Sequence, residues 1–170
     1  MNELDNITKD IEYMKIVENI MANQKFNQIK QCKHHGLTRY EHSLRVSYYS
    51  YLITKKLHLN YIETARAGLL HDFFITDDLK EKEQKLNMFV HPYKALTNSN
   101  NYFDLTDLEK DIIINHMFPT LPHKIPKHLE SWIVSLVDKI VATYEFACSY
   151  GKLFLYKYSQ IYFLLVLFRI

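Results

Sequence analysis

Two adjacent residues with metal-binding side chains, His71 and Asp72, end a run of small and leucine residues that begins at Glu63. Such a run is typical of a buried helix, so we expect the pair at the tip of one. Imidazole nitrogen and carboxylate oxygen are ligands of divalent transition metals, and six of them could enclose one or two ions inside a helical bundle. Further candidate ligands lie at wide intervals on both sides of the pair: His42, His91, His116 and Asp138.

The elements that must position these residues are predicted to be helices. The chain has 170 residues, of which 48% are hydrophobic, with 3 Gly and 4 Pro, a composition that favours long helices around a sizeable core. Capping signals at Thr38, Asn60 and Thr106 mark three helix starts. Gly68 inside a helix indicates a close helix contact. We therefore predict an all-α bundle, with helices over 4–21, 38–57, 60–72, 106–116 and 129–149.

Two of the candidate ligands are placed by their neighbours. Pro92 suits the first turn of a helix, where its missing N–H costs nothing, so His91 is expected at a helix start. Asp138 stands in the middle of an apolar helix and needs a partner, either a cation or a metal ion. The residues expected on the inward side of that helix are apolar: Trp132, Ile133, Leu136, Val137, Ile140, Val141 and Tyr144.

Composition also bounds the domain organisation and the partners. We expect an N-terminal helical extension packed on the bundle (1–30), a main domain (31–150) and an apolar C-terminal helix (151–170). That last segment is interrupted by polar residues and is too short for the ~20 apolar residues of a membrane span, so it suits a core or homodimer contact. The net charge of +2 and scattered lysines argue against binding to a nucleic-acid duplex. Two distant cysteines, Cys32 and Cys148, are expected to be reduced thiols of a cytoplasmic protein.

The ordered ligand set resembles the HD superfamily of metal-dependent phosphohydrolases, across residues 38–145. The resemblance is carried by His42 in Tyr-Glu-His-Ser-Leu-Arg-Val, the doublet in Gly-Leu-Leu-His-Asp, and Asp138 in Ser-Leu-Val-Asp-Lys. His91 in Val-His-Pro and His116 in Ile-Asn-His-Met resemble the extra histidines of its two-metal branches. In ligand order the chain is similar to bacterial enzymes that resemble symmetrical diadenosine tetraphosphate hydrolases. That branch commonly carries a basic residue soon after the doublet, whereas Phe73-Phe-Ile follows here, which suggests an apolar or aromatic pocket wall.

The resemblance implies an all-α HD domain at 31–150 with a metal centre in the middle of its bundle. By analogy, the first ion would be held by His42, His71, Asp72 and Asp138. His91 and His116 would complete a second site, with Asp72 bridging the two ions in the catalytic role. A histidine-rich set favours transition metals over magnesium, with iron expected first and manganese, cobalt, nickel or zinc as alternatives. Two such ions would activate water for attack at phosphorus.

The function expected from these residues is hydrolysis of a phosphoester or phosphoanhydride in a nucleotide or another small phosphorylated metabolite. The first candidate for binding the phosphate is Lys94, three residues after His91 and hence on the same helix face. Arg45 has the same relation to His42 but could instead pair with Glu41. Roles for Asp77 and Lys139 stay open. Two alternatives use the same ligands: a di-iron oxygenase, and a non-catalytic binding module with a metal staple.

Overall fold

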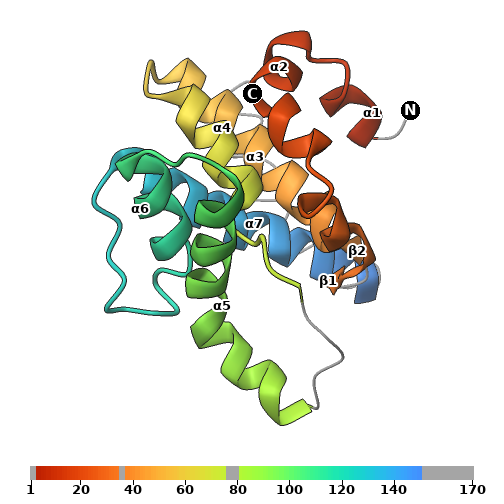
Figure 1. The fold of residues 1–170 in the computed structure, drawn as a ribbon, viewed down its shortest axis with the longest axis vertical. Helices are drawn as coiled ribbons and strands as arrows, with labels where there is room; N and C mark the ends of the chain where they lie inside the picture. The colour runs from red at the N-terminus through yellow and green to blue at the C-terminus, as the bar shows by residue number, and fades with distance from the viewer. Residues whose placement is uncertain (1–2, 35–36, 76–80, 151–170) are drawn as a thin grey trace.

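Helices account for nearly all of the regular structure in the computed structural model, which describes residues 3–34, 37–75 and 81–150. One antiparallel pair of two-residue strands, β1 (Lys33–His34) and β2 (Leu37–Thr38), is the exception in this part of the chain. The predicted all-α fold is confirmed. The helices, shown in Figure 1, are α1 (Glu3–Ile7), α2 (Ile11–Ala22), the 3-10 helix η1 (Phe26–Gln31), α3 (Arg39–Lys56), α4 (Tyr61–Leu70), α5 (Glu81–Tyr102), α6 (Asp107–Asn115) and α7 (Leu129–Tyr150).

Capping boxes start two of these helices, as the sequence predicts. The Thr38 hydroxyl accepts a hydrogen bond from the Glu41 backbone N–H at 3.2 Å, and the Glu41 carboxylate accepts one from the Thr38 N–H at 2.8 Å. Thr106 and Glu109 repeat the arrangement at 3.2 and 2.9 Å. Each box satisfies N–H groups that a helix start leaves without partners. The first box fixes the place of His42, which lies in the first turn of α3.

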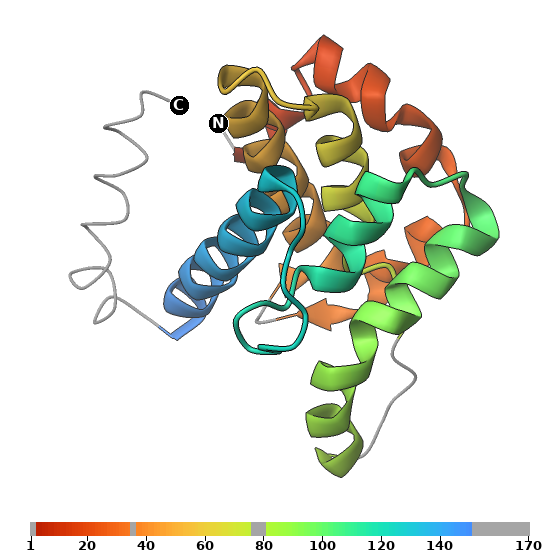
Figure 2. The same ribbon diagram turned by 90° about the vertical axis from the view of Figure 1, so that its left-hand side faces the viewer.

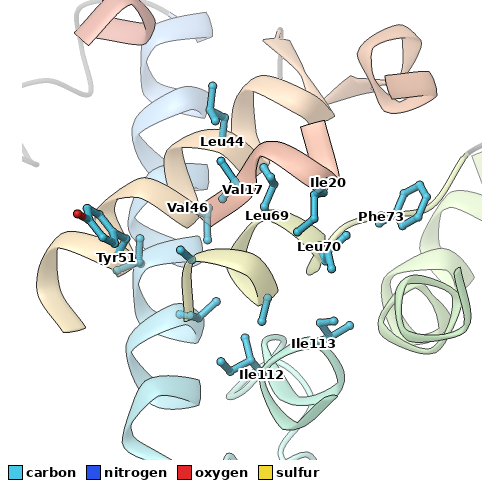
Figure 3. Packing of buried hydrophobic residues seen from close by; sticks show 14 of the residues in the cluster. Val17, Ile20, Leu44, Val46, Tyr51, Leu69, Leu70, Phe73, Ile112 and Ile113 are labelled. Atoms are coloured by element: carbon cyan, nitrogen blue, oxygen red, sulfur yellow. The ribbon is translucent and has the colours of Figure 1, made fainter. Parts of the chain in front are cut away.

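The helix α4 lies at the centre of the bundle. It contacts α2, α3, α5, α6 and α7, and its C-terminal end leads into His71 and Asp72. Figure 3 shows the apolar side chains that gather around it. Because this helix is surrounded on most sides, the doublet at its end is carried into the interior of the molecule. The labelled core residues are Val17, Ile20, Leu44, Val46, Tyr51, Leu69, Leu70, Phe73, Ile112 and Ile113.

The helices α3 and α4 approach closely at Gly68, as predicted. A Cβ atom on Gly68 would lie 2.9 Å from the Cα of Ser47, a distance at which the backbones would have to move apart. The Ser47 hydroxyl donates to the Ala65 carbonyl at 2.6 Å and accepts from the Tyr13 hydroxyl at 2.8 Å. These bonds join α2, α3 and α4 across the contact.

Two predicted helix starts are wrong. Residues 4–21 form two helices rather than one, because Asp10 caps a new helix by accepting from the Tyr13 N–H at 3.0 Å. The helix that carries His91 begins at Glu81, and Pro92 lies inside it. The charged run after Glu81 is rich in good helix formers, which extend the helix through a proline that removes one hydrogen bond. The N-terminal half of α5 extends away from the other helices (Figure 2).

The predicted inward face of α7 is wrong in part. Val137 and Val141 are buried, but Asp138 and Glu145 are buried as well. These polar side chains turn the helix so that part of its apolar face points outward. Three apolar residues expected inside are exposed: Trp132 (42%), Leu136 (62%) and Tyr144 (50%).

The remaining predictions concern the N-terminal extension and the C-terminal helix. The helix α2 contacts α4 and η1, so the N-terminal helices pack on the bundle. The helix predicted at 151–170 lies outside the described residues, and the division at residues 30 and 150 stays a prediction. Among the described helices, none has both the length and the apolar character needed to cross a membrane.

The close contact at Gly68 predicts that even a methyl side chain at this position destabilises the fold. Replacing Gly68 by Ala should lower the free energy of unfolding by about 1–3 kcal/mol, because the added methyl group forces α3 and α4 apart. Urea unfolding of the chelator-treated protein measures this change in the free energy of unfolding. The exposed change Ile62→Ala on the same helix should stay within about 0.5 kcal/mol of the wild type. Equal stability of the two variants would contradict the close contact.

Candidate metal centre

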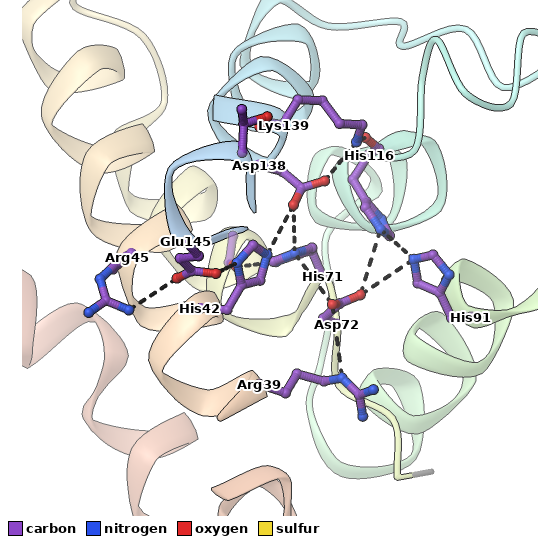
Figure 4. Close-up of polar contacts among 12 residues, drawn as sticks. Arg39, His42, Arg45, His71, Asp72, His91, His116, Asp138, Lys139 and Glu145 are labelled. Carbon is purple, nitrogen blue, oxygen red and sulfur yellow. Dashed lines mark hydrogen bonds and ion pairs between the residues drawn. The ribbon is translucent and has the colours of Figure 1, made fainter. Parts of the chain in front are cut away.

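The structure brings the six predicted ligands together where five helices meet. His42 comes from α3, His71 and Asp72 from the end of α4, His91 from α5, His116 from the end of α6, and Asp138 from α7 (Figure 4). None of the six residues is more than 8% exposed. Polar groups buried this deeply in an apolar bundle need partners, and the six side chains provide some of these for one another. Their role as metal ligands stays a prediction.

Two of the histidines are oriented by the ends of their own helices. His71 and His116 are the C-cap residues of α4 and α6. Their Nδ1 atoms lie 2.7 Å from the carbonyl oxygens of Gly68 and Ile113, each three residues earlier. Because a carbonyl can only accept, Nδ1 carries the hydrogen and the lone pair stands on Nε2. Both rings therefore present Nε2 to the centre, as a metal ligand requires.

One group of three ligand atoms suits a single ion. His42 Nε2 lies 3.0 Å from Asp138 Oδ1, and His71 Nε2 lies 3.7 Å from the same oxygen. The ligand atoms of all three residues lie within 4.8 Å of one another. His71 Nε2 is buried and has no hydrogen-bond partner among the described residues. Since a buried lone pair without a partner is costly, this donor set fits a divalent cation.

A second group adjoins the first and shares His71 with it. It contains Asp72 and His116, whose ligand atoms also lie within 4.8 Å of those of His71. Asp72 Oδ1 lies 3.8 Å from His116 Nε2 and 3.4 Å from His91 Nε2, and the two imidazole nitrogens are 2.9 Å apart. Figure 4 shows Asp72 between His71 on one side and His91 and His116 on the other. Its bridging role stays a prediction.

Burial and neighbouring charges set the protonation of the ligands. Burial holds the pKa of His116 well below its usual value, and nearby imidazoles act in the same direction. Burial alone would raise the pKa of Asp138, but Lys139 and the hydrogen bond from His42 lower it well below its usual value. Burial lowers the pKa of His42, yet its hydrogen bonds to Asp138 and Glu145 outweigh this and raise it to about 10. Without metal, His42 is therefore a cation between two carboxylates.

Each of the three buried carboxylates at this centre has a cationic side chain beside it. When the imidazoles are neutral, as metal ligands must be, these pairs leave the labelled side chains of Figure 4 close to neutral overall. A bound divalent ion would then add charge that the protein does not offset. The pairs are Arg39 Nε with Asp72 at 4.0 Å, Arg45 Nη1 with Glu145 at 3.0 Å, and Lys139 Nζ with Asp138 at 2.7 Å.

The predicted substrate-binding residues lie in different surroundings. Arg45 is buried against Glu145, on the far side of His42 from the other ligands, and not against Glu41 as the alternative held (Figure 4). Lys94 is exposed on α5. Lys139, whose role the sequence analysis left open, donates to the His116 carbonyl at 2.9 Å and so reaches the centre. Asp77 lies outside the described residues.

Arg39 and Glu145 were missed by the sequence analysis. Arg39 stands three residues before His42, and Glu145 stands seven residues after Asp138, so helical spacing alone would have placed both on ligand-bearing faces. Arg39 Nη1 donates to the Phe74 carbonyl at 2.6 Å, and its guanidinium lies 3.7 Å from the centroid of the Phe74 ring. The same ring lies 5.3 Å from the His91 ring.

An all-α bundle whose helix ends bring histidines and aspartates into one buried cluster defines a class of metal-dependent proteins. The family model for the HD domain matches residues 39–143, which is more than half of the chain. The chain belongs to the HD domain family, a family of the metal-dependent phosphohydrolase type. Neither the curated proteins nor the solved structures contain a match to the chain.

The shared position of His71 leads to a prediction about metal content. Replacing His71 by Ala should reduce the metal-to-protein ratio at least tenfold, because an ion loses a ligand whichever of the two groups holds it. Elemental analysis of the purified protein measures the ratio. His123→Ala removes an exposed histidine and should leave the ratio unchanged. A His71 variant with the metal content of the wild type would contradict the proposed ligand set.

Proposed function

We propose that this protein is a two-metal phosphohydrolase. Its substrate would be a nucleotide or another small phosphorylated metabolite, and a metal-activated water would cleave the phosphoester or phosphoanhydride. The observation that supports this most is the charge balance of the centre, where three cations stand beside three carboxylates. A loaded centre would be strongly cationic, and a phosphate group is the anion that offsets such a charge.

Two overlapping ligand groups support two ions rather than one. His42, His71, Asp72 and Asp138 would hold the first, and Asp72, His91 and His116 the second. Bound ions would lower the pKa of a water and offset charge on the phosphoryl oxygens. The imidazole-rich donors favour iron, with manganese, cobalt, nickel and zinc as alternatives. Asp72 Oδ1 faces His91 and His116 and its Oδ2 lies 4.0 Å from His71 Nε2, so Asp72 is the residue we place in the catalytic role.

Arg39 is the side chain we assign to the phosphoryl group of the substrate. It is 4% exposed, and its Nε has no hydrogen-bond partner among the described residues. The Phe74 ring and carbonyl hold the guanidinium in place beside Asp72. A fixed guanidinium with an unused N–H suits a phosphoryl oxygen better than exposed Lys94 or Arg45, which is bound to Glu145.

Metal removal gives the first test of hydrolysis. Treatment with a chelator should abolish release of phosphate from a panel of nucleotides, dinucleotides and phosphomonoesters, and adding back iron or manganese should restore it. Asp72→Asn should lower kcat at least a hundredfold, since it removes the charge placed between the ions. Turnover that survives complete metal removal would exclude this mechanism.

The assignment of Arg39 predicts a change in substrate affinity. Arg39→Gln should raise KM for the best phosphate ester at least tenfold and leave the metal content unchanged, because the residue contacts substrate rather than metal. Arg39→Lys keeps the positive charge but lacks the planar guanidinium, so its KM should lie between those of the wild type and Arg39→Gln. Arg66→Gln disrupts another Arg–Glu pair, with Glu109, and serves as the control. Loss of metal without a rise in KM would mean that Arg39 only orients Asp72.

A further inference from the structure

His42 is held between two carboxylates of the same helix. Its Nε2 lies 3.0 Å from Asp138 Oδ1, and its Nδ1 lies 2.8 Å from Glu145 Oε2. Asp138 and Glu145 are seven residues apart on α7, which is about two helical turns, so they share one face. Glu145 is 1% exposed and lies beyond the residues that match the family model.

The partner of Nδ1 distinguishes His42 from two other histidines of the centre. His71 and His116 donate their Nδ1–H to neutral backbone carbonyls, whereas His42 donates to a carboxylate. A carboxylate accepts a stronger hydrogen bond and makes the opposite nitrogen a better electron donor to a metal. Glu145 therefore acts on the metal-facing Nε2 through the ring.

Arg45 fixes the orientation of this carboxylate. Its Nη1 lies 3.0 Å from Glu145 Oε1, which leaves Oε2 directed at His42 (Figure 4). The pair is buried, with the Arg45 side chain 10% and the Glu145 side chain 1% exposed. A buried ion pair holds its geometry only when its remaining hydrogen-bonding groups are used, and His42 uses the second oxygen here.

We propose that Glu145 is a positioning residue that gives the His42–His71–Asp138 group the higher metal affinity, so that this group binds the first divalent ion. Glu145 keeps the hydrogen on Nδ1, so Nε2 is the nitrogen available to a metal ion, and Arg45 keeps Glu145 in place. The inference concerns the order and strength of metal binding. It rests on the metal centre of the proposed function and does not depend on hydrolysis.

The test is a titration of the metal-free, full-length protein with Co²⁺, followed by visible absorption and by competition with a chelating dye. Glu145→Ala should weaken binding of the first ion by 10- to 100-fold and shift its absorption bands, while Glu145→Gln, which can still accept a hydrogen bond, should lose less. The matched control is Glu109→Gln, because Glu109 is also 1% exposed and paired with an arginine, Arg66, away from the centre. It should keep the affinity and the spectrum of the wild type.

Arg45→Gln provides a second variant, in case Glu145→Ala does not fold by circular dichroism. It leaves the Glu145 carboxylate in the chain and should weaken binding of the first ion by a smaller factor than Glu145→Ala does. First-ion affinity unchanged in both Glu145→Gln and Arg45→Gln would overturn the inference. Equal losses in Glu109→Gln would also overturn it, since they would reflect stability alone. If Co²⁺ binds in the expected order but no phosphate is released from any substrate, the inference about Glu145 is supported and the proposed hydrolytic activity is contradicted.

Discussion

The structure depends on a solution to one electrostatic problem, the burial of three carboxylates inside an apolar bundle. A carboxylate without a partner in such surroundings costs several kcal/mol, so the fold must supply positive charge at each one. Arg39, Arg45 and Lys139 do so, and α3 and α7 bring them in along with the ligands. This requirement explains the orientation of α7, whose inward face is used by Asp138 and Glu145 at the cost of exposing apolar side chains.

A single glycine connects the packing of the bundle to the geometry of the centre. Gly68 allows α4 to approach the backbone of α3 at Ser47, and its carbonyl accepts the Nδ1–H of His71. The first property sets the distance between the helices that carry His42 and His71. The second sets the direction of the His71 ring. Packing and ligand orientation are thus determined at the same residue, which is why a small residue is needed one turn before the doublet.

Much of this arrangement could be predicted from the sequence, because the relevant signals are local. Capping boxes at Thr38 and Thr106 marked real helix starts, and ordered histidines and aspartates marked the centre. Pro92 misled because a proline signals a helix start only when the preceding residues are poor helix formers. The inward face of α7 was misjudged because hydrophobicity was weighed without the charges that Asp138 must meet. Glu145 was missed because its spacing of seven residues from Asp138, which places both on one helix face, was not considered, although its contact with His42 joins residues far apart in the sequence.

The ligand set by itself serves several chemistries, so the groups around it must discriminate among them. Oxygen activation on a di-iron centre does not by itself require an anionic substrate, whereas a phosphohydrolase always binds one. A metal used only as a staple would favour surroundings in which every buried donor is satisfied. Arg39 is the group that bears on this choice, since its buried Nε has no hydrogen-bond partner among the described residues and lies 4.0 Å from Asp72. An anionic group arriving with the substrate is the partner that would satisfy it, and this favours a phosphate ester over the alternatives.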